Sequence, residues 1–235
     1  MFLALYVDDI LLIGNDVELL NSVKNYLDSK FSMKDLGEVA YVLGIKIYRD
    51  RLRRLLALSQ STYLDKILKR SGMDTAKKGS LPVIKNKTLR KAHCPVTEQG
   101  KAEMTKHPYA SAIGSIMYAM LCTRPCVALA LSLTNRFQSN PGKEHWIVLK
   151  CILKHLKKTK EMVLVYDGSD EELGITSYVD ATFNTYPDDS KSQTGYVFKV
   201  NEGAVCWRSG KQPIMVQSTM ELEYIAASEA ASEAV

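Results

Sequence analysis

Two adjacent carboxylates, Asp8 and Asp9, interrupt an apolar stretch at the start of the chain. The runs on either side, residues 2–7 and 10–13, have the length and composition of strands that are buried on both faces. The pair therefore falls where the two strands reverse. A hairpin can hold two carboxylates side by side, and Mg²⁺ prefers such oxygen ligands together with substrate phosphates. Aspartate also favours turns that bind no metal, because its side chain hydrogen-bonds the nearby backbone, so the residues alone leave both interpretations open.

The charged residues divide the chain into a basic and an acidic part. Residues 1–161 contain 27 Lys and Arg against 14 Asp and Glu, whereas residues 162–235 contain 4 against 12. The basic part has the charge of a polyanion-binding surface, although an ordinary solvated surface can have the same composition. No apolar run approaches the roughly 20 residues that span a bilayer, so we expect no membrane partner. The five cysteines match no disulfide or zinc spacing and predict reduced thiols in a cytoplasmic or nuclear protein that is not secreted.

Hydrophobic periodicity predicts an α+β chain. Apolar positions with helical spacing predict helices at residues 17–29, after Ser59, at 108–121 and 127–138, after Asn140, and at 220–234. Runs rich in β-branched and aromatic residues predict strands at 39–48, 55–58, 173–179, 195–200 and 204–208. Asn15 with Glu18 predicts a capping box for the first helix, Ser59 caps the second, and Asn140 with Pro141 predicts the start of a later one. Residues 71–103 show no period and are expected to form a linker or a tract that wraps around something.

The helix expected after Asn140 has two different faces. Its apolar face is predicted to bury Trp146, Leu149, Leu153 and Leu156. Its polar face carries five lysines, namely Lys143, Lys150, Lys154, Lys157 and Lys158. A one-sided lysine stripe can follow a phosphate backbone, but an exposed amphipathic helix has the same pattern.

Several sequence strings resemble one family. Tyr6-Val7-Asp8-Asp9 in its apolar hairpin resembles the palm hairpin of reverse transcriptases. Later strings follow the order seen in copia-type retrotransposon Pol polyproteins of plants, namely Leu43-Gly44-Ile45, Tyr109-Ala110-Ser111, Cys122-Thr123-Arg124-Pro125, Tyr178-Val179-Asp180, Thr194-Gly195-Tyr196 and Glu221-Leu222-Glu223-Tyr224. On these strings the chain is identified as a member of that family, with the C-terminal part of the reverse transcriptase and the N-terminal half of the ribonuclease H.

The resemblance implies three segments. Residues 1–73 would be the C-terminal part of the palm, residues 74–161 a linker with a helical thumb or connection, and residues 162–235 half of a ribonuclease H-like mixed sheet. The parent activity would be RNA-directed DNA synthesis with cleavage of the RNA–DNA hybrid, using two Mg²⁺ ions.

The same resemblance implies the site residues. Asp8 and Asp9 match the polymerase hairpin, while Asp180 and Glu221 match two ribonuclease H carboxylates, with Glu223 a rival to Glu221. The remaining carboxylates would lie before Met1 and after Val235, so we expect this chain to be catalytically incomplete. Residues 182–185 and Cys126 depart from the family pattern.

Two alternatives remain open at this stage. Residues 46–160 could act as a residual nucleic-acid-binding module for RNA, DNA or an RNA–DNA hybrid, with Lys150, Lys154, Lys157 and Lys158 on the phosphates. The chain could also be a subunit whose sites are completed in trans by another Pol fragment.

Overall fold

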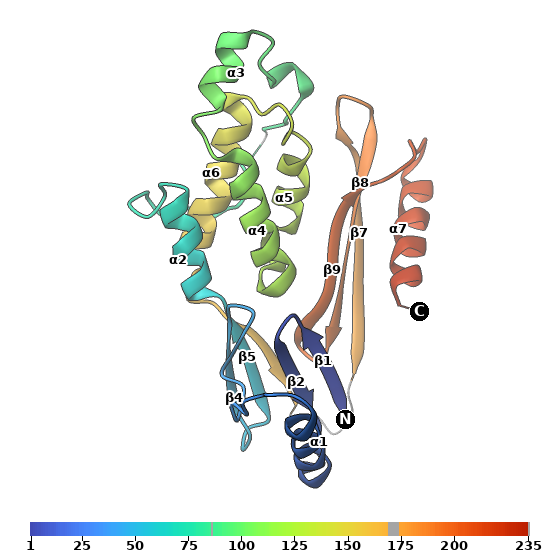
Figure 1. Cartoon of the computed structure of the whole chain (residues 1–235). Coiled ribbons are helices and arrows are strands. Elements are labelled where there is room, and N and C mark those ends of the chain that lie inside the picture. Colours follow the sequence, from blue (N-terminus) through green and yellow to red (C-terminus); the bar gives the residue numbers. More distant parts are fainter. Residues whose placement is uncertain (86, 169–173, 235) are drawn as a thin grey trace. The chain divides into compact units, whose positions relative to one another are not determined.

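The computed structural model describes residues 1–85, 87–168 and 174–234, and its chain divides into two compact units, Met1–Val39 and Ala40–Val235. Over these residues the chain combines helices with three sheets, all of them antiparallel (Figure 1). The predicted α+β class is therefore confirmed. Within the described ranges, no helix has the length and hydropathy needed to cross a membrane.

The first unit consists of one hairpin and one helix. Strands β1 (Phe2–Tyr6) and β2 (Asp9–Ile13) pair in antiparallel fashion, with Tyr6 opposite Asp9. Helix α1 (Val17–Lys30) is capped by Asp16, whose carboxylate accepts a hydrogen bond from the Leu19 backbone N–H at 3.0 Å. The predicted cap at Asn15 is wrong by one residue. The prediction of doubly buried strands is also wrong: Phe2 is 77% exposed, because two strands and one helix are too few to cover both faces.

The second unit begins with a four-stranded sheet. Its strands occur in the order β3 (Tyr41–Val42), β4 (Ile45–Asp50), β5 (Leu55–Ser59) and β6 (Leu164–Asp167). The single strand predicted at 39–48 is wrong, because Leu43 and Gly44 both have positive φ and turn the chain between β3 and β4. The sequence analysis missed β6, which pairs Tyr166 with Leu56 across more than a hundred residues. This pairing joins two of the segments that the resemblance separates.

A helical core follows the sheet (Figure 1). It is built from α2 (Ser61–Arg70), α4 (Tyr109–Thr123), α5 (Ala128–Asn135) and α6 (Lys143–Lys158). The predicted apolar face of α6 is confirmed, since Trp146, Leu149, Leu153 and Leu156 are all buried.

The predicted starts of two of these helices are wrong. Helix α6 is capped by Gly142 rather than Asn140, because the Gly142 N–H donates to His145 Nδ1 at 2.8 Å. The close His93 carbonyl leaves no room for a Cβ at position 142. Helix α2 is capped by Gln60, without a side-chain hydrogen bond, rather than by Ser59.

Two short elements lie among the described residues of the tract that was predicted to lack regular structure. They are the 3₁₀ helix η1 (Lys91–His93) and helix α3 (Glu98–Met104), whose cap Thr97 accepts a hydrogen bond from the Gly100 N–H. Another 3₁₀ turn, η2 (Pro125–Val127), links α4 to α5. The expectation of an element-free tract is therefore wrong at its C-terminal end, where a Thr cap supports a helix of only seven residues.

The last part is a three-stranded meander with one helix against it. Its strands are β7 (Ile175–Tyr186), β8 (Lys191–Val200) and β9 (Gly203–Lys211), followed by α7 (Thr219–Glu233). Strand β7 continues past its predicted end at residue 179 because its pairing with β8 extends to Tyr186. The described sheet is antiparallel throughout rather than mixed, since hairpins connect its strands. Residues 169–172 and the first residue of the strand predicted at 173–179 lie outside the described residues.

Hydrogen bonds hold the meander to its neighbours. The Thr194 hydroxyl donates to the Glu229 carboxylate at 2.8 Å, and the Tyr196 hydroxyl to Glu233 at 3.0 Å, so α7 is docked on β8. The Tyr166 hydroxyl of β6 donates to the Ala204 carbonyl of β9 at 2.8 Å. The four-stranded and three-stranded sheets are therefore linked directly.

Arg124 connects the end of α4 to the end of α6. It is 4% exposed, and its guanidinium donates to the carbonyls of Thr159, Lys160 and Met162 at 2.7–2.9 Å. Burial lowers its pKa from the ordinary arginine value, so the three carbonyls are needed to hold the charge. This clamp directs the chain from α6 into β6.

We expect Arg124→Met to lower the free energy of unfolding by about 2–4 kcal/mol, because it removes charge-assisted hydrogen bonds and leaves buried carbonyls unsatisfied. Urea unfolding followed by circular dichroism measures this loss. The matched control is Arg70→Met at the exposed end of α2, which should change stability by less than about 0.5 kcal/mol. Equal effects of the two substitutions would contradict the clamp.

His145 should make stability depend on pH. It is fully buried against the ring of Phe137, and burial, followed by the nearby His93, lowers its pKa to about 4. Below pH 6.5, the ordinary pKa of histidine, the unfolded chain therefore binds a proton at this residue. The folded chain does not bind that proton until the pH approaches 4. We expect the free energy of unfolding to fall by up to about 3 kcal/mol as the pH decreases from about 6.5 to about 4.

Unfolding curves across this range measure the slope. His145→Asn is the control, because asparagine can still accept from the Gly142 N–H but does not titrate. The variant should start from a lower stability and show a shallower slope. An unchanged slope would rule out His145 as its source.

Candidate functional site

Asp8 and Asp9 lie at the tip of the β1–β2 hairpin. Asp8 is in the turn and Asp9 is the first residue of β2, and both are exposed. Val7, beside them in the turn, has a φ of 52°, which is unfavourable for a β-branched residue. The prediction that the pair sits where the strands reverse is confirmed.

Asp180 and Glu221 lie on separate elements of the second unit. Asp180 is an exposed residue in the middle of β7, opposite Gly195 of β8. Glu221 is in the first turn of α7, where its carboxylate accepts a hydrogen bond from the Gln217 N–H at 2.9 Å. Glu223 is exposed two residues further along the same helix. Glu221 therefore also serves to shape the start of α7.

The donor chemistry of these residues suits a hard cation. Carboxylate oxygens are the ligands that Mg²⁺ prefers, and one or two of them commonly suffice when phosphate and water supply the rest. Asp8 and Asp9 fit such a partial set. Across residues 1–85, 87–168 and 174–234, no three His, Cys, Asp or Glu side chains gather as a potential metal site.

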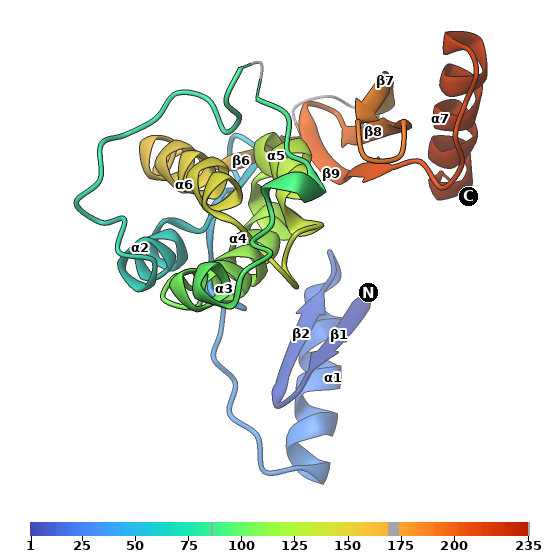
Figure 2. The same ribbon diagram turned by 90° about the horizontal axis from the view of Figure 1, so that it is seen from above.

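Part of the lysine face of α6 is covered by the chain itself. Residues 74–80, which we call the strap, pass along α6 within the long tract between α2 and η1 (Figure 2). Lys157 Nζ donates to the Asp74 and Ala76 carbonyls, and Lys158 Nζ to the Ser80 hydroxyl at 2.8 Å. Two of the four lysines predicted to bind phosphate therefore bind the strap.

A close backbone contact holds the strap in place. The Gly79 N–H donates to the Lys154 carbonyl at 3.0 Å, and a Cβ at Gly79 would lie 2.9 Å from the Cβ of Lys154. The His155 ring and the Ser80 carbonyl are hydrogen-bonded at 2.9 Å. Only glycine allows the strap to approach α6 this closely at position 79. A shift of the strap along α6 would break the hydrogen bonds to Lys154 and His155.

The strap adds basic residues that the lysine stripe did not include. Lys77 and Lys78 are exposed on the strap, while Lys150 and Lys154 of α6 are half-buried. The basic composition of residues 71–103 pointed to Lys77 and Lys78 as additional basic residues. It did not indicate which helix the tract would cover.

Comparison with known proteins finds a family match over the part of the chain that contains the β1–β2 hairpin. Residues 1–85 match the reverse transcriptase (RNA-dependent DNA polymerase) family. Over 235 residues the chain is 45% identical to the retrovirus-related Pol polyprotein from transposon TNT 1-94 of Nicotiana tabacum, and it spans 18% of that protein's length. No solved structure matches the chain.

Two shorter relatives cover most of the chain. An uncharacterized mitochondrial protein of Arabidopsis thaliana, AtMg00810, is 32% identical over 99% of this chain and 92% of its own length. A putative transposon Ty5-1 protein of Saccharomyces cerevisiae is 32% identical over 99% of this chain and 73% of its own length. The chain belongs to the family of copia-type, retrovirus-related Pol polyproteins.

Proposed function

We propose that the chain carries part of the catalytic region of a Pol polyprotein that synthesises DNA on RNA and cleaves the RNA–DNA hybrid. In this proposal residues 1–73 belong to a palm, residues 74–161 to a helical thumb or connection, and residues 162–235 to a ribonuclease H-like sheet. The observation that carries it is the β1–β2 hairpin, which presents Asp8 and Asp9 at its tip within the family match. The β7–β8–β9 meander with α7 docked on it supports the last assignment.

The metal ligands that we propose are the carboxylates implied by the family resemblance. Asp8 and Asp9 would hold Mg²⁺ at the polymerase site, and Asp180 with Glu221 at the hydrolytic one, with Glu223 the rival of Glu221. When bound, Mg²⁺ stabilises negative charge on the reacting phosphate oxygens. The exposure of Asp8 and Asp9 leaves their oxygens accessible to such an ion.

We propose further that this chain alone catalyses neither reaction. The resemblance requires more carboxylates than the two it assigns to each site. Adjacent Asp8 and Asp9 supply only part of a two-metal set. A second Pol fragment could provide the remainder in trans.

We expect the purified chain, Asp8→Asn and Asp180→Asn all to show background rates in Mg²⁺-dependent primer extension and hybrid cleavage, because the two carboxylates at each proposed site supply only part of a two-metal set. Activity of the unmodified chain that either substitution abolishes would contradict the incompleteness. A mixture with a separately purified upstream Pol fragment tests completion in trans. Extension by that mixture, lost with Asp8→Asn, would identify the chain as a subunit.

The basic surface supports a second candidate function, a nucleic-acid-binding module. Lys150 and Lys154 of α6 remain beside the strap, whose Lys77 and Lys78 are exposed. The partners would be RNA, DNA or an RNA–DNA hybrid, held through their phosphates. Lys157 and Lys158 would contribute their charge while their ammonium groups hold the strap.

We expect binding of an RNA–DNA hybrid to weaken steeply with salt, because each phosphate contact releases counterions. The double substitution Lys77→Gln and Lys78→Gln should reduce the slope of log affinity against log salt by about 2. Fluorescence anisotropy over a salt series measures the slope. Lys34→Gln, an exposed lysine of the first unit, is the control and should leave it unchanged. Absent or salt-insensitive binding would exclude this function.

A further inference from the structure

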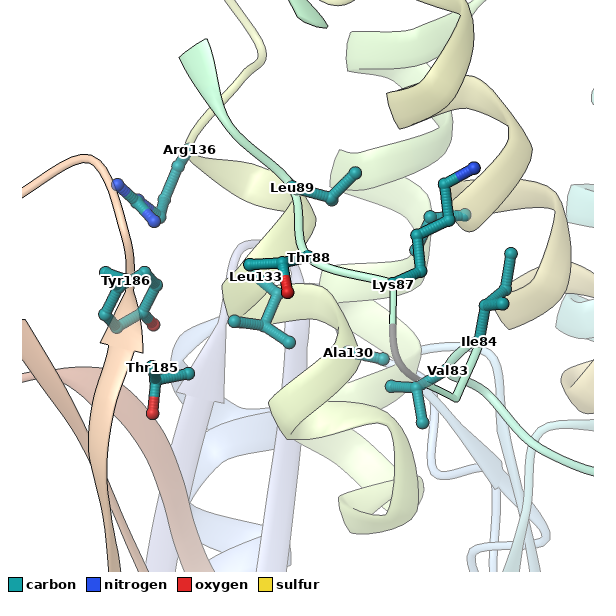
Figure 3. Close-up of a pocket in the computed structure, with 11 residues that line it drawn as sticks. Val83, Ile84, Lys87, Thr88, Leu89, Ala130, Leu133, Arg136, Thr185 and Tyr186 are labelled. Atoms are coloured by element: carbon teal, nitrogen blue, oxygen red, sulfur yellow. The ribbon is translucent and has the colours of Figure 1, made fainter. Parts of the chain in front are cut away.

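Arg136 is a half-buried cation at the end of α5. Its guanidinium carbon lies 4.2 Å from the centre of the Tyr186 ring and 5.5 Å from that of Phe137. Figure 3 shows its side chain over Tyr186. In the part of the chain that the structure covers, no hydrogen bond or ion pair engages this guanidinium. Its N–H donors are therefore available to a ligand.

Arg136 and Tyr186 lie between two cavities. The smaller one, of about 140 Å³, is drawn in Figure 3 and has mostly apolar walls. The larger one, of about 280 Å³, also has mostly apolar walls, with several polar side chains among them. Its walls besides Arg136 and Tyr186 include Lys211, Ser132, Ser209, Met117, Met120 and Leu131.

The charges around the larger cavity leave a positive excess. Lys211 forms an ion pair with Asp189, and the charge of Arg136 also acts on Asp189. The Asp189 carboxylate therefore interacts with both cations but can neutralise only one of their two positive charges. The cavity has a net attraction for an anion.

The stacking partner of Arg136 is held rigidly. Tyr186 is 1% exposed, and its hydroxyl donates to the Gln193 side chain. Gln193 in turn donates to the Ser209 hydroxyl at 2.7 Å. A guanidinium stacked on a fixed ring has a defined orientation, which reduces the entropy lost when it binds a planar pair of oxygens.

We propose that the larger cavity binds a small phosphorylated ligand no larger than a mononucleotide. The Arg136 fork matches two phosphate oxygens, which makes arginine the preferred residue for bidentate phosphate binding. Met117, Met120 and Leu131 provide a wall for the apolar part of the ligand. The cavity volume lies just below that of typical ligand pockets, which range from about 300 to 1,000 Å³, so only a small ligand fits. This site is separate from the carboxylates and lysines of the proposed function.

Trp207 provides a built-in reporter for the test. Its indole N–H donates to the Met120 carbonyl at 3.1 Å, beside the cavity wall. The probes are AMP, adenosine and inorganic phosphate, titrated into the full chain while tryptophan fluorescence and calorimetric heat are recorded. We expect saturable AMP binding with an affinity of about 1 mM or tighter, and weaker binding of adenosine and of phosphate alone.

Two variants decide the role of Arg136. Arg136→Gln should weaken AMP binding about tenfold or more, because it removes the charge and the fork. Arg208→Gln, an exposed arginine on β9 that does not line the cavity, should leave binding unchanged. Circular dichroism confirms that both variants are folded.

The unmodified chain keeps the proposal testable even if Arg136→Gln does not fold. Absence of saturable AMP binding, or adenosine binding as tightly as AMP, would overturn the phosphate site. Phosphate binding as tightly as AMP would overturn the role of the apolar wall. Arg136→Gln binding AMP with unchanged affinity would also overturn the proposal.

Discussion

Burial of one face of α6 is the interaction on which most of the second unit depends. Leu149, Ile152, Leu153 and Leu156 are fully buried within the cluster that α2, α4 and α5 share. Each such side chain contributes roughly 1.5–3 kcal/mol when it leaves water. Because Arg124 clamps the chain just beyond α6, the same packing also sets the path into β6. The helical core and the four-stranded sheet are therefore positioned by one helix.

Lysines on the polar face of α6 hold the strap in place, a structural role that the composition of the helix does not reveal. A lysine stripe on an amphipathic helix is commonly solvated, yet Lys157 donates to backbone carbonyls of the strap. These bonds satisfy polar groups of a long irregular tract that would otherwise depend on water. Arg136 differs from Lys157, because its guanidinium is half-buried and stacked on an aromatic ring instead of bonded to backbone carbonyls. Charge alone thus did not distinguish the lysines that hold the strap from the arginine to which we assign phosphate binding.

The sequence predicted the parts of the fold that local patterns encode. Apolar periodicity located α1, α4 and α7 closely, and Asp8 with Asp9 fell at the hairpin tip as expected. Helix starts were less predictable, because the Gly142 cap depends on His145 and on the close carbonyl of His93. The four residues of β6 follow a lysine-rich helix and have no periodic signal of their own. Their strand conformation comes from pairing with β5.

By itself, the sequence determined the family, the secondary-structure class, the adjacent hairpin carboxylates and the apolar face of α6, because each depends on residues close together in the chain. Only the tertiary structure decided which lysines the strap occupies, how β6 joins β5, and that Arg136 lies over Tyr186. Those contacts join residues about 50 to more than 100 positions apart. Their energies depend on packing and desolvation at sites that no local period specifies.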